Sequence, residues 1–247
     1  MPIEVRLFPC LSDNYGYLVR DTATGDTAAV DTPDGQAVLG ELQASGWCLS
    51  LILNTHWHPD HTQGNADVQA ATGAQIVGPA EVRRAAPLDR EVKGGDEVVL
   101  GRTRFQVLDT GGHTLGHISY YDAANHAAFV GDTLFALGCG RLFEGTPAMM
   151  WDSLQRLSAL PDETTVYCAH EYTASNARYA LTLDRGEALA TRAREVFAAR
   201  QRGEPTVPTS IGVEKATNPF LRALELVGGD PVTAFTKIRA GKDDFKG

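Results

Sequence analysis

The sequence predicts an α/β protein with more than one β-sheet, followed by a smaller helical segment. Up to about residue 172, ten or so short apolar runs alternate with Gly, Asp and Thr, the usual boundaries of strands. Helical patterns lie between some of these runs. After about residue 173 the strand-like runs give way to helical periodicity. We therefore predict an α/β domain over residues 1–172 and a helical domain over residues 173–247.

The predicted strands are short and mostly apolar. In chain order they read IEVRLF, YGYLVR, TAAVD, LSLILNTH, AQIVG, DEVVL, RFQVLDT, HISYYD, AAFVGD and TTVYCAH. One helix is expected to begin near Thr62 and to end at the cap Gly73, and WDSLQRLSAL is a second helix that Pro161 stops.

The last third of the chain predicts further helices. LDRGEALATRAREVFAAR has an apolar helical face and arginines elsewhere. LRALELV and PVTAFTKIRA indicate two shorter helices, and proline-containing loops separate them from the rest.

Composition excludes several classes of protein. A chain of 247 residues that is 43% hydrophobic and 21% charged can bury a full core. A net charge of −9 argues against nucleic acid or an anionic membrane as a partner. The apolar runs are far shorter than the roughly 20 residues of a membrane span. Because the N-terminus lacks the pattern of a secretory signal, we expect a cytoplasmic protein with four free cysteines.

The stretch NTHWHPDHTQGN, residues 54–65, carries the strongest chemical signal. It follows an apolar strand and brings His56, His58, Asp60 and His61 into one short loop. A lone histidine is most often structural, but four donors this close together are costly unless a cation organises them. Imidazole and carboxylate together suit zinc, iron or manganese better than calcium or magnesium. The loop therefore predicts a divalent metal site.

One short loop cannot surround two ions, so further donors must come from other strand ends. His113, Asp132 and His170 each follow a predicted strand. With the first four they make seven donors, which is enough for two ions if one carboxylate bridges them. His117 is better explained as a hydrogen-bonding partner than as a ligand. Asp31 is either a turn carboxylate or a partner of a ligand histidine, and both interpretations stay open.

These motifs resemble a known family. The pattern H-x-H-x-D-H, with the His of GGHTLGH, the Asp of GDTLF and the His of CAHEYT, is similar to the ligand set of the metallo-β-lactamase superfamily. SDNYGYLV, FALGCGRLFEGT, VYCAHEYT, TNPFLR and RAGKDDFK resemble glyoxalase II, the hydroxyacylglutathione hydrolases, from about Ser12 to Lys246. The resemblance implies an αββα sandwich with a binuclear metal site and a small C-terminal helical domain that helps to bind glutathione.

The resemblance also implies roles for single residues. The metal ligands would form two sets with one shared, bridging member: His56, His58 and His113; Asp60, His61 and His170; and Asp132 as the bridge. The glutathione moiety would meet five residues: Arg141, Phe143, Tyr172, Arg239 and Lys242. The common family pattern has lysine and tyrosine where this chain has Arg141 and Phe143. Arginine keeps the charge with a different geometry, and phenylalanine removes a hydroxyl group.

The activity that the resemblance implies is hydrolysis of the thioester of S-(2-hydroxyacyl)glutathione, typically S-D-lactoylglutathione, in methylglyoxal detoxification. Two divalent ions, Zn²⁺ in the first place and Fe or Mn as alternatives, would bind a hydroxide that attacks the thioester carbonyl. Asp60 would orient that hydroxide, and Cys139 would have no nucleophilic role. We expect a monomer whose partner is the glutathione thioester substrate.

Three other functions are open to this set of motifs. A persulfide dioxygenase of the same fold is expected to lack the helical extension that ends in RAGKDDFK. A flavodiiron oxygen reductase is expected to have a carboxylate at the position of His58 and a flavin domain. A metal-carrying module without enzymatic activity would not need the separate basic residues.

Overall fold

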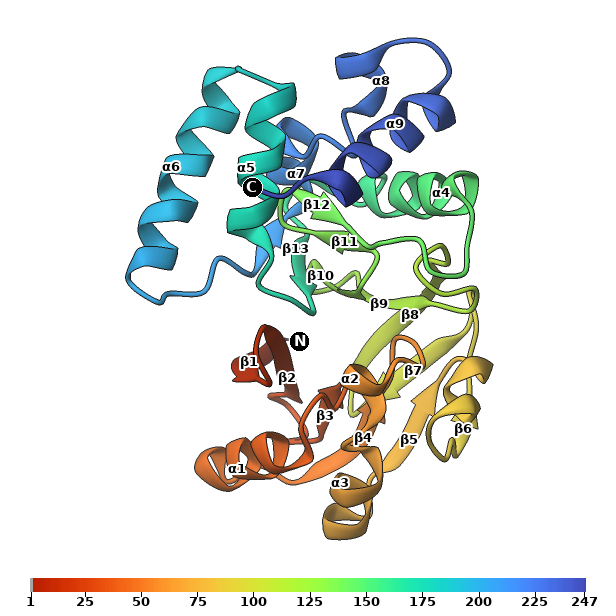
Figure 1. Ribbon diagram of the computed structural model, residues 1–247. Helices are drawn as coiled ribbons and strands as arrows, with labels where there is room; N and C mark the ends of the chain where they lie inside the picture. The colour runs from red at the N-terminus through yellow and green to blue at the C-terminus, as the bar shows by residue number, and fades with distance from the viewer. Residues whose placement is uncertain (1) are drawn as a thin grey trace. The chain divides into compact units, whose positions relative to one another are not determined.

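The chain runs through two compact units in the computed structural model, which describes residues 2–247 (Figure 1). The first unit contains residues 2–109 and 116–131, and the second contains residues 110–115 and 132–247. The segment DTGGHTLGH therefore contributes to both units. The division at residue 172 that the sequence suggests remains a prediction.

A six-stranded sheet forms one layer of the first unit, in the order β1-β2-β3-β4-β5-β6. Neighbours are antiparallel from β1 to β3 and parallel from β3 to β6. Parallel neighbours need a crossover, and helices supply it between β3 and β4 and between β4 and β5. The elements are β1 (Ile3–Cys10), β2 (Asn14–Asp21), β3 (Thr27–Val30), α1 (Gly35–Ser45), β4 (Leu49–Leu53), α2 (Pro59–Thr62), α3 (Asn65–Thr72), β5 (Gln75–Gly78), the 3₁₀ helix Ala80–Arg84 and β6 (Arg90–Glu91).

The remaining strands of the first unit form an antiparallel meander, in which neighbouring strands follow one another along the chain. They are β7 (Glu97–Leu100), β8 (Thr103–Asp109), β9 (Ile118–Asp122) and β10 (Ala127–Gly131). Both faces of β2 are covered. Leu18 belongs to a core cluster with Val38 of α1 and Val68 of α3, whereas the ring of its neighbour Tyr17 lies 5.8 Å from the ring of Phe129 in β10. Since successive side chains point to opposite faces, the helices cover one face and the meander covers the other.

The helix boundaries follow local sequence signals. The Asp34 side chain caps α1 by accepting from the N–H groups of Gln36 and Ala37. Gly73 ends α3 in the left-handed conformation, with φ of 73°, as predicted. Among residues 2–247, no helix is both long and apolar enough to cross a membrane.

The second unit contains the predicted helices and several more. The helix predicted from WDSLQRLSAL begins earlier, because the Thr146 side chain caps it and Pro147 occupies its first turn. The predicted apolar face of LDRGEALATRAREVFAAR forms the buried face of α6: Leu189, Ala193 and Val196 are buried, and Phe197 is partly buried against them. The elements are β11 (Leu134–Phe135), β12 (Gly138–Cys139), α4 (Pro147–Ser158), β13 (Thr165–Cys168), α5 (Thr173–Leu183), α6 (Glu187–Gln201), β14 (Thr209–Ser210), α7 (Ile211–Thr217), α8 (Ala223–Val227) and α9 (Pro231–Asp244). Strands β11 and β12 form one antiparallel pair, and β13 and β14 another.

Candidate metal centre

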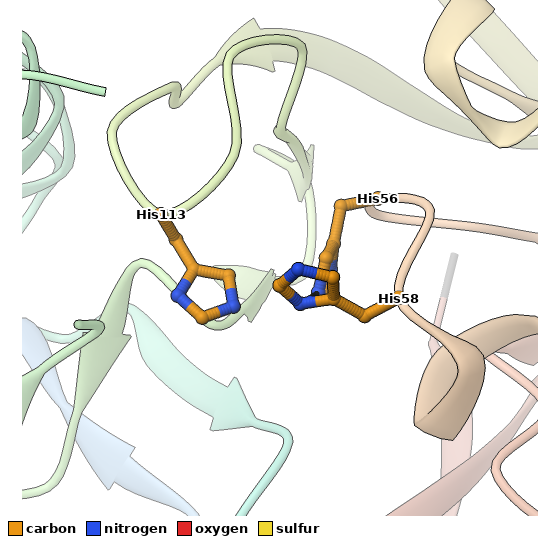
Figure 2. Close-up of side chains that lie close together, drawn as sticks. All are labelled: His56, His58 and His113. Carbon is orange, nitrogen blue, oxygen red and sulfur yellow. Dashed lines mark hydrogen bonds between the residues drawn. The ribbon is translucent and has the colours of Figure 1, made fainter. Parts of the chain in front are cut away.

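The histidine-rich loop of the first unit lies directly after β4. Pro59 starts the short helix α2 inside the motif, so the loop turns sharply between His58 and His61. His56 Nε2 lies 3.1 Å from His58 Nδ1, and both rings project from the turn that follows β4 (Figure 2). His61 Nε2 lies 3.7 Å from Asp60 Oδ2. The four predicted donors of this loop thus form two close pairs within the first unit.

Neighbouring side chains hold these donors in place. Asn14 Nδ2 donates to Asp60 Oδ2 over 3.1 Å and to the Asp60 carbonyl over 3.2 Å. Asp31 Oδ2 accepts from His61 Nδ1 over 2.8 Å, so this carboxylate is a partner of a predicted ligand. His117 is buried and its ring stacks on His56 with centroids 4.8 Å apart, which agrees with a supporting role.

The second unit brings together the other three predicted ligands. Asp132 follows β10 directly, and its Oδ2 lies 3.3 Å from His113 Nε2 and 3.3 Å from His170 Nε2. His113 Nδ1 donates to the carbonyl of Arg141 over 2.8 Å, which leaves Nε2 as the basic nitrogen. Gly140 allows this approach, because a Cβ at that position would clash with the Asp132 carbonyl oxygen. His113 is shown on its own loop in Figure 2.

The donor set fits a divalent metal ion. A tetrahedral ion with ligand bonds of about 2.0–2.1 Å places its ligand atoms roughly 3.4 Å apart. The donor pairs within each unit are separated by 3.1, 3.3, 3.3 and 3.7 Å. Each of the seven predicted ligands also belongs to a group of His and Asp side chains that could hold a metal ion. The donors therefore support binding of divalent metal ions.

Two aromatic residues of the predicted substrate set lie beside ligand histidines of the second unit. The Tyr172 ring stacks on His170, with an interplanar angle of 3° and centroids 4.7 Å apart. The Phe143 ring meets His113 edge to face at 5.2 Å, and Phe143 is 61% exposed. Both rings are thus accessible next to predicted metal ligands.

Two of the predicted basic residues, Arg141 and Arg239, share the carboxylate of Asp243. Asp243 Oδ1 lies 3.3 Å from Arg141 Nε and accepts from Arg239 Nη2 over 3.0 Å. Arg239 is only 6% exposed, and it also donates to the Cys139 carbonyl over 2.8 Å. Lys242 Nζ donates to the hydroxyl and the carbonyl of Ser175 over 2.8 and 3.2 Å. Burial is the main cause that lowers the pKa of Lys242 to about 8, and neighbouring arginines add to the effect.

The Cys139 thiol is poorly suited to act as a nucleophile. All four cysteines are free, as expected, and Cys139 is buried. Burial raises the pKa of the Cys139 thiol to about 11, so it stays protonated at neutral pH even with Arg239 close to it.

Several contributing residues were not predicted. Asn14, Thr55, Ser175 and Asp243 each contact a predicted site residue. Asn14 and Asp243 lie within SDNYGYLV and RAGKDDFK, stretches that carried the resemblance, but nothing in their spacing indicated which neighbour they would meet.

Comparison with known proteins agrees with these features. Residues 14–170 match the family model of the metallo-beta-lactamase superfamily, and residues 171–245 match that of the hydroxyacylglutathione hydrolase C-terminus. A hydroxyacylglutathione hydrolase of Erythrobacter litoralis is 53% identical over 98% of this chain and 100% of its own length.

Two solved structures are also similar. The crystal structure of ETHE1 from Myxococcus xanthus has a TM-score of 0.71 and 32% identity, and the match covers 96% of this chain and 90% of that one. The crystal structure of TTHA1623 in a di-iron-bound form has a TM-score of 0.63 and 26% identity over 84% of this chain and 95% of that one. The chain has the metallo-β-lactamase fold with a C-terminal helical domain, and it belongs to the hydroxyacylglutathione hydrolase family.

Proposed function

We propose that the chain hydrolyses the thioester of S-(2-hydroxyacyl)glutathione, typically S-D-lactoylglutathione, to glutathione and the 2-hydroxy acid. One observation carries the proposal: the match to the hydroxyacylglutathione hydrolase C-terminus follows directly on the match to the metallo-β-lactamase superfamily. A persulfide dioxygenase is expected to lack this C-terminal segment, so the match favours the hydrolase.

The proposed cofactor is a pair of divalent metal ions, with Zn²⁺ preferred over Fe or Mn. One ion would bind to His56, His58 and His113, and the other to Asp60, His61 and His170. Asp132 would bridge them, and the equal distances of 3.3 Å from its Oδ2 to one histidine of each set support this role. When bound, such cations polarise a carbonyl group and lower the pKa of water.

The remaining chemistry belongs to the side chains of this protein. Asp60 Oδ2 is held by Asn14, and the Asp60 side chain is 40% exposed, so it can orient the attacking water. The oxygen of water bonds to the acyl carbon and the C–S bond breaks. The sulfur departs as a thiolate, and a proton from the attacking water ends on it.

Recognition of the glutathione moiety is assigned to Arg141, Phe143, Tyr172, Arg239 and Lys242. Arg141 and Lys242 would meet carboxylate groups of the tripeptide. Arg239 is buried against Asp243 and the Cys139 carbonyl, and we propose that it contributes by holding that cluster in position. A cytoplasmic location and a monomeric state remain predictions from the sequence.

The purified protein should cleave S-D-lactoylglutathione, and removal of metal with a chelator should abolish the activity. Adding back Zn²⁺, Fe²⁺ or Mn²⁺ separately should restore it and identify the effective metal. The control substrate is a short thioester without the tripeptide, which should react slowly. Activity that survives exhaustive chelation would contradict the proposal.

A further inference from the structure

A buried carboxylate and a buried hydroxyl connect two predicted ligand histidines of the first unit. Asp31 Oδ1 accepts from the Thr55 N–H over 2.8 Å, and Asp31 Oδ2 accepts from Thr55 Oγ1 over 2.9 Å. The same Oδ2 accepts from His61 Nδ1 over 2.8 Å. Thr55 Oγ1 lies 3.0 Å from His56 Nδ1. Asp31, Thr55, His56 and His61 are each at most 3% exposed, so water does not compete for these bonds.

The chemistry of these groups fixes where the protons lie. A carboxylate only accepts, so His61 Nδ1 must carry a proton and donate it. The Thr55 hydroxyl has one proton, which it gives to Asp31, so toward His56 it can only accept. His56 Nδ1 must therefore carry a proton as well. In both neutral rings the lone pair is then on Nε2, the nitrogen available to a metal ion.

The backbone places Asp31 where it can serve both rings. Asp31 has a left-handed conformation, with φ of 56°, which aspartate tolerates better than most residues. Its N–H donates to the Leu53 carbonyl over 3.0 Å, and the N–H of Thr32 donates to the His61 carbonyl over 2.9 Å. Gly64 permits this packing, because a Cβ there would lie 2.8 Å from the Thr32 carbonyl oxygen.

We propose that Asp31 and Thr55 are positioning residues that set the tautomers of His61 and His56 together, so that one carboxylate prepares one ligand of each metal ion. His61 is controlled directly and His56 through the Thr55 hydroxyl. This inference rests on the proposed function in that it assigns the two histidines to different ions. Partners of ligating histidines typically change metal affinity by 10- to 100-fold, so loss of either residue should weaken metal binding.

Thr55→Val and Asp31→Asn should change the tautomers of His56 and His61 in different ways. Thr55→Val removes the hydroxyl without changing the β-branched shape, so His56 should lose its preference for the Nδ1 proton while His61 keeps it. In Asp31→Asn, the amide oxygen is expected to stay opposite the Thr55 N–H, which turns the NH₂ group toward Thr55 Oγ1 and His61. Both rings should then move their proton to Nε2.

The test is long-range ¹H–¹⁵N spectroscopy of the histidine rings in the metal-free protein at pH 8, combined with Zn²⁺ affinity by chelator competition. Wild type and Thr55→Ser should show both rings protonated at Nδ1. Thr55→Val and Asp31→Asn should change the spectra as described and weaken Zn²⁺ binding at least tenfold. Thr32→Val is the matched control, because it removes a buried hydroxyl that bonds Asn65 and no imidazole, and it should change neither readout.

The inference is overturned if either wild-type ring carries its proton on Nε2, or if Thr55→Val leaves the His56 spectrum and the Zn²⁺ affinity unchanged. The spectra are independent of catalysis. If they behave as expected while no glutathione thioester is cleaved, the proposed function fails and the tautomer assignment stands.

Discussion

Phe143 is an exposed ring beside His113, at a position where the family resemblance implies tyrosine. Phe143→Tyr restores a hydroxyl that can donate to the glutathione moiety. One neutral hydrogen bond contributes about 0.5–1.5 kcal/mol, so KM for S-D-lactoylglutathione should fall about 2- to 12-fold with little change in kcat. Phe143→Leu is the control, since it lacks the hydroxyl and should not lower KM. An unchanged KM in Phe143→Tyr would mean that another group already fills this role.

Single residues differ in how far the sequence predicts their surroundings. The loop from His56 to His61 could be interpreted because four metal-binding side chains within six positions rarely occur together without a metal ion. The environment of Asp31 could not, because its contacts depend on a left-handed backbone and on a strand more than twenty positions away. Arg239 would ordinarily be exposed near a chain end. Tertiary packing instead buries it, with its guanidinium over the Phe220 ring and bonded to the Cys139 carbonyl.

At the scale of elements, Asp21 joins the end of β2 to the turn between β7 and β8. Its buried carboxylate accepts from the N–H groups of Ala23, Thr24 and Arg102 and from the Thr103 hydroxyl. Although burial acts in the opposite direction, these hydrogen bonds lower the pKa of Asp21 to about 2. Asp21→Ala leaves these donors without their acceptor and should destabilise the protein by about 3 kcal/mol, measured by urea unfolding at pH 7.

The difference in unfolding free energy between wild type and Asp21→Ala should depend on pH in one direction. Because the folded-state pKa of Asp21 lies below its ordinary value of 3.8, the contribution of the ionised carboxylate is fully present above pH 4. It is lost as the pH falls from about 4 to about 2. The stability gap between wild type and Asp21→Ala should narrow over this range, whereas the exposed Asp152→Ala should stay close to wild type throughout. A constant gap would contradict the assigned pKa.

Elements were predictable where their pattern was long enough. The longer strands appear as apolar runs, and the terminal helix α9 shows helical periodicity. Helix α1 was missed because its sequence, GQAVLGELQAS, contains two glycines and little apolar periodicity, although Asp34 and Gly46 cap it. Strands β11, β12 and β14 are two residues long, and no periodic signal exists at that length.

At the scale of the whole molecule, composition and strand patterns predicted an α/β protein but not its topology. Ten strands with helices between them can be connected in many ways. The sandwich was expected only from the family resemblance. The net charge likewise does not predict how the substrate is recognised. A net charge of −9 disfavours an anionic substrate, so under the proposed function recognition would depend on cations that folding gathers locally around Lys242, namely Arg141 and Arg239, with Arg178 also close enough to affect the pKa of Lys242.

The pH dependence of substrate selection tests this local gathering of charge. Burial lowers the pKa of Lys242 to about 8, and the nearby cations of Arg239, Arg141 and Arg178 add to this effect. The Asp243 carboxylate acts in the opposite direction. Only the protonated ammonium attracts a carboxylate of glutathione. As the pH rises through about 8, kcat/KM for S-D-lactoylglutathione should therefore fall relative to kcat/KM for a thioester without the tripeptide.

The ratio of the two kcat/KM values removes any titration at the metal centre, which affects both substrates alike, and comparison with Lys242→Arg removes the titration of the α-amino group of glutathione itself. A charged hydrogen bond contributes roughly 1.5–3 kcal/mol, so with a pKa of about 8 the ratio should drop about 8- to 25-fold between pH 7 and pH 9.5 through Lys242 alone. Lys242→Arg stays charged over this range, so its ratio should reflect only the titration of the substrate's α-amino group. Lys242→Met should have the low ratio already at pH 7, with an unchanged metal content. If the wild-type ratio follows that of Lys242→Arg, Lys242 does not meet the substrate carboxylate, and the charge recognition must be assigned to Arg141.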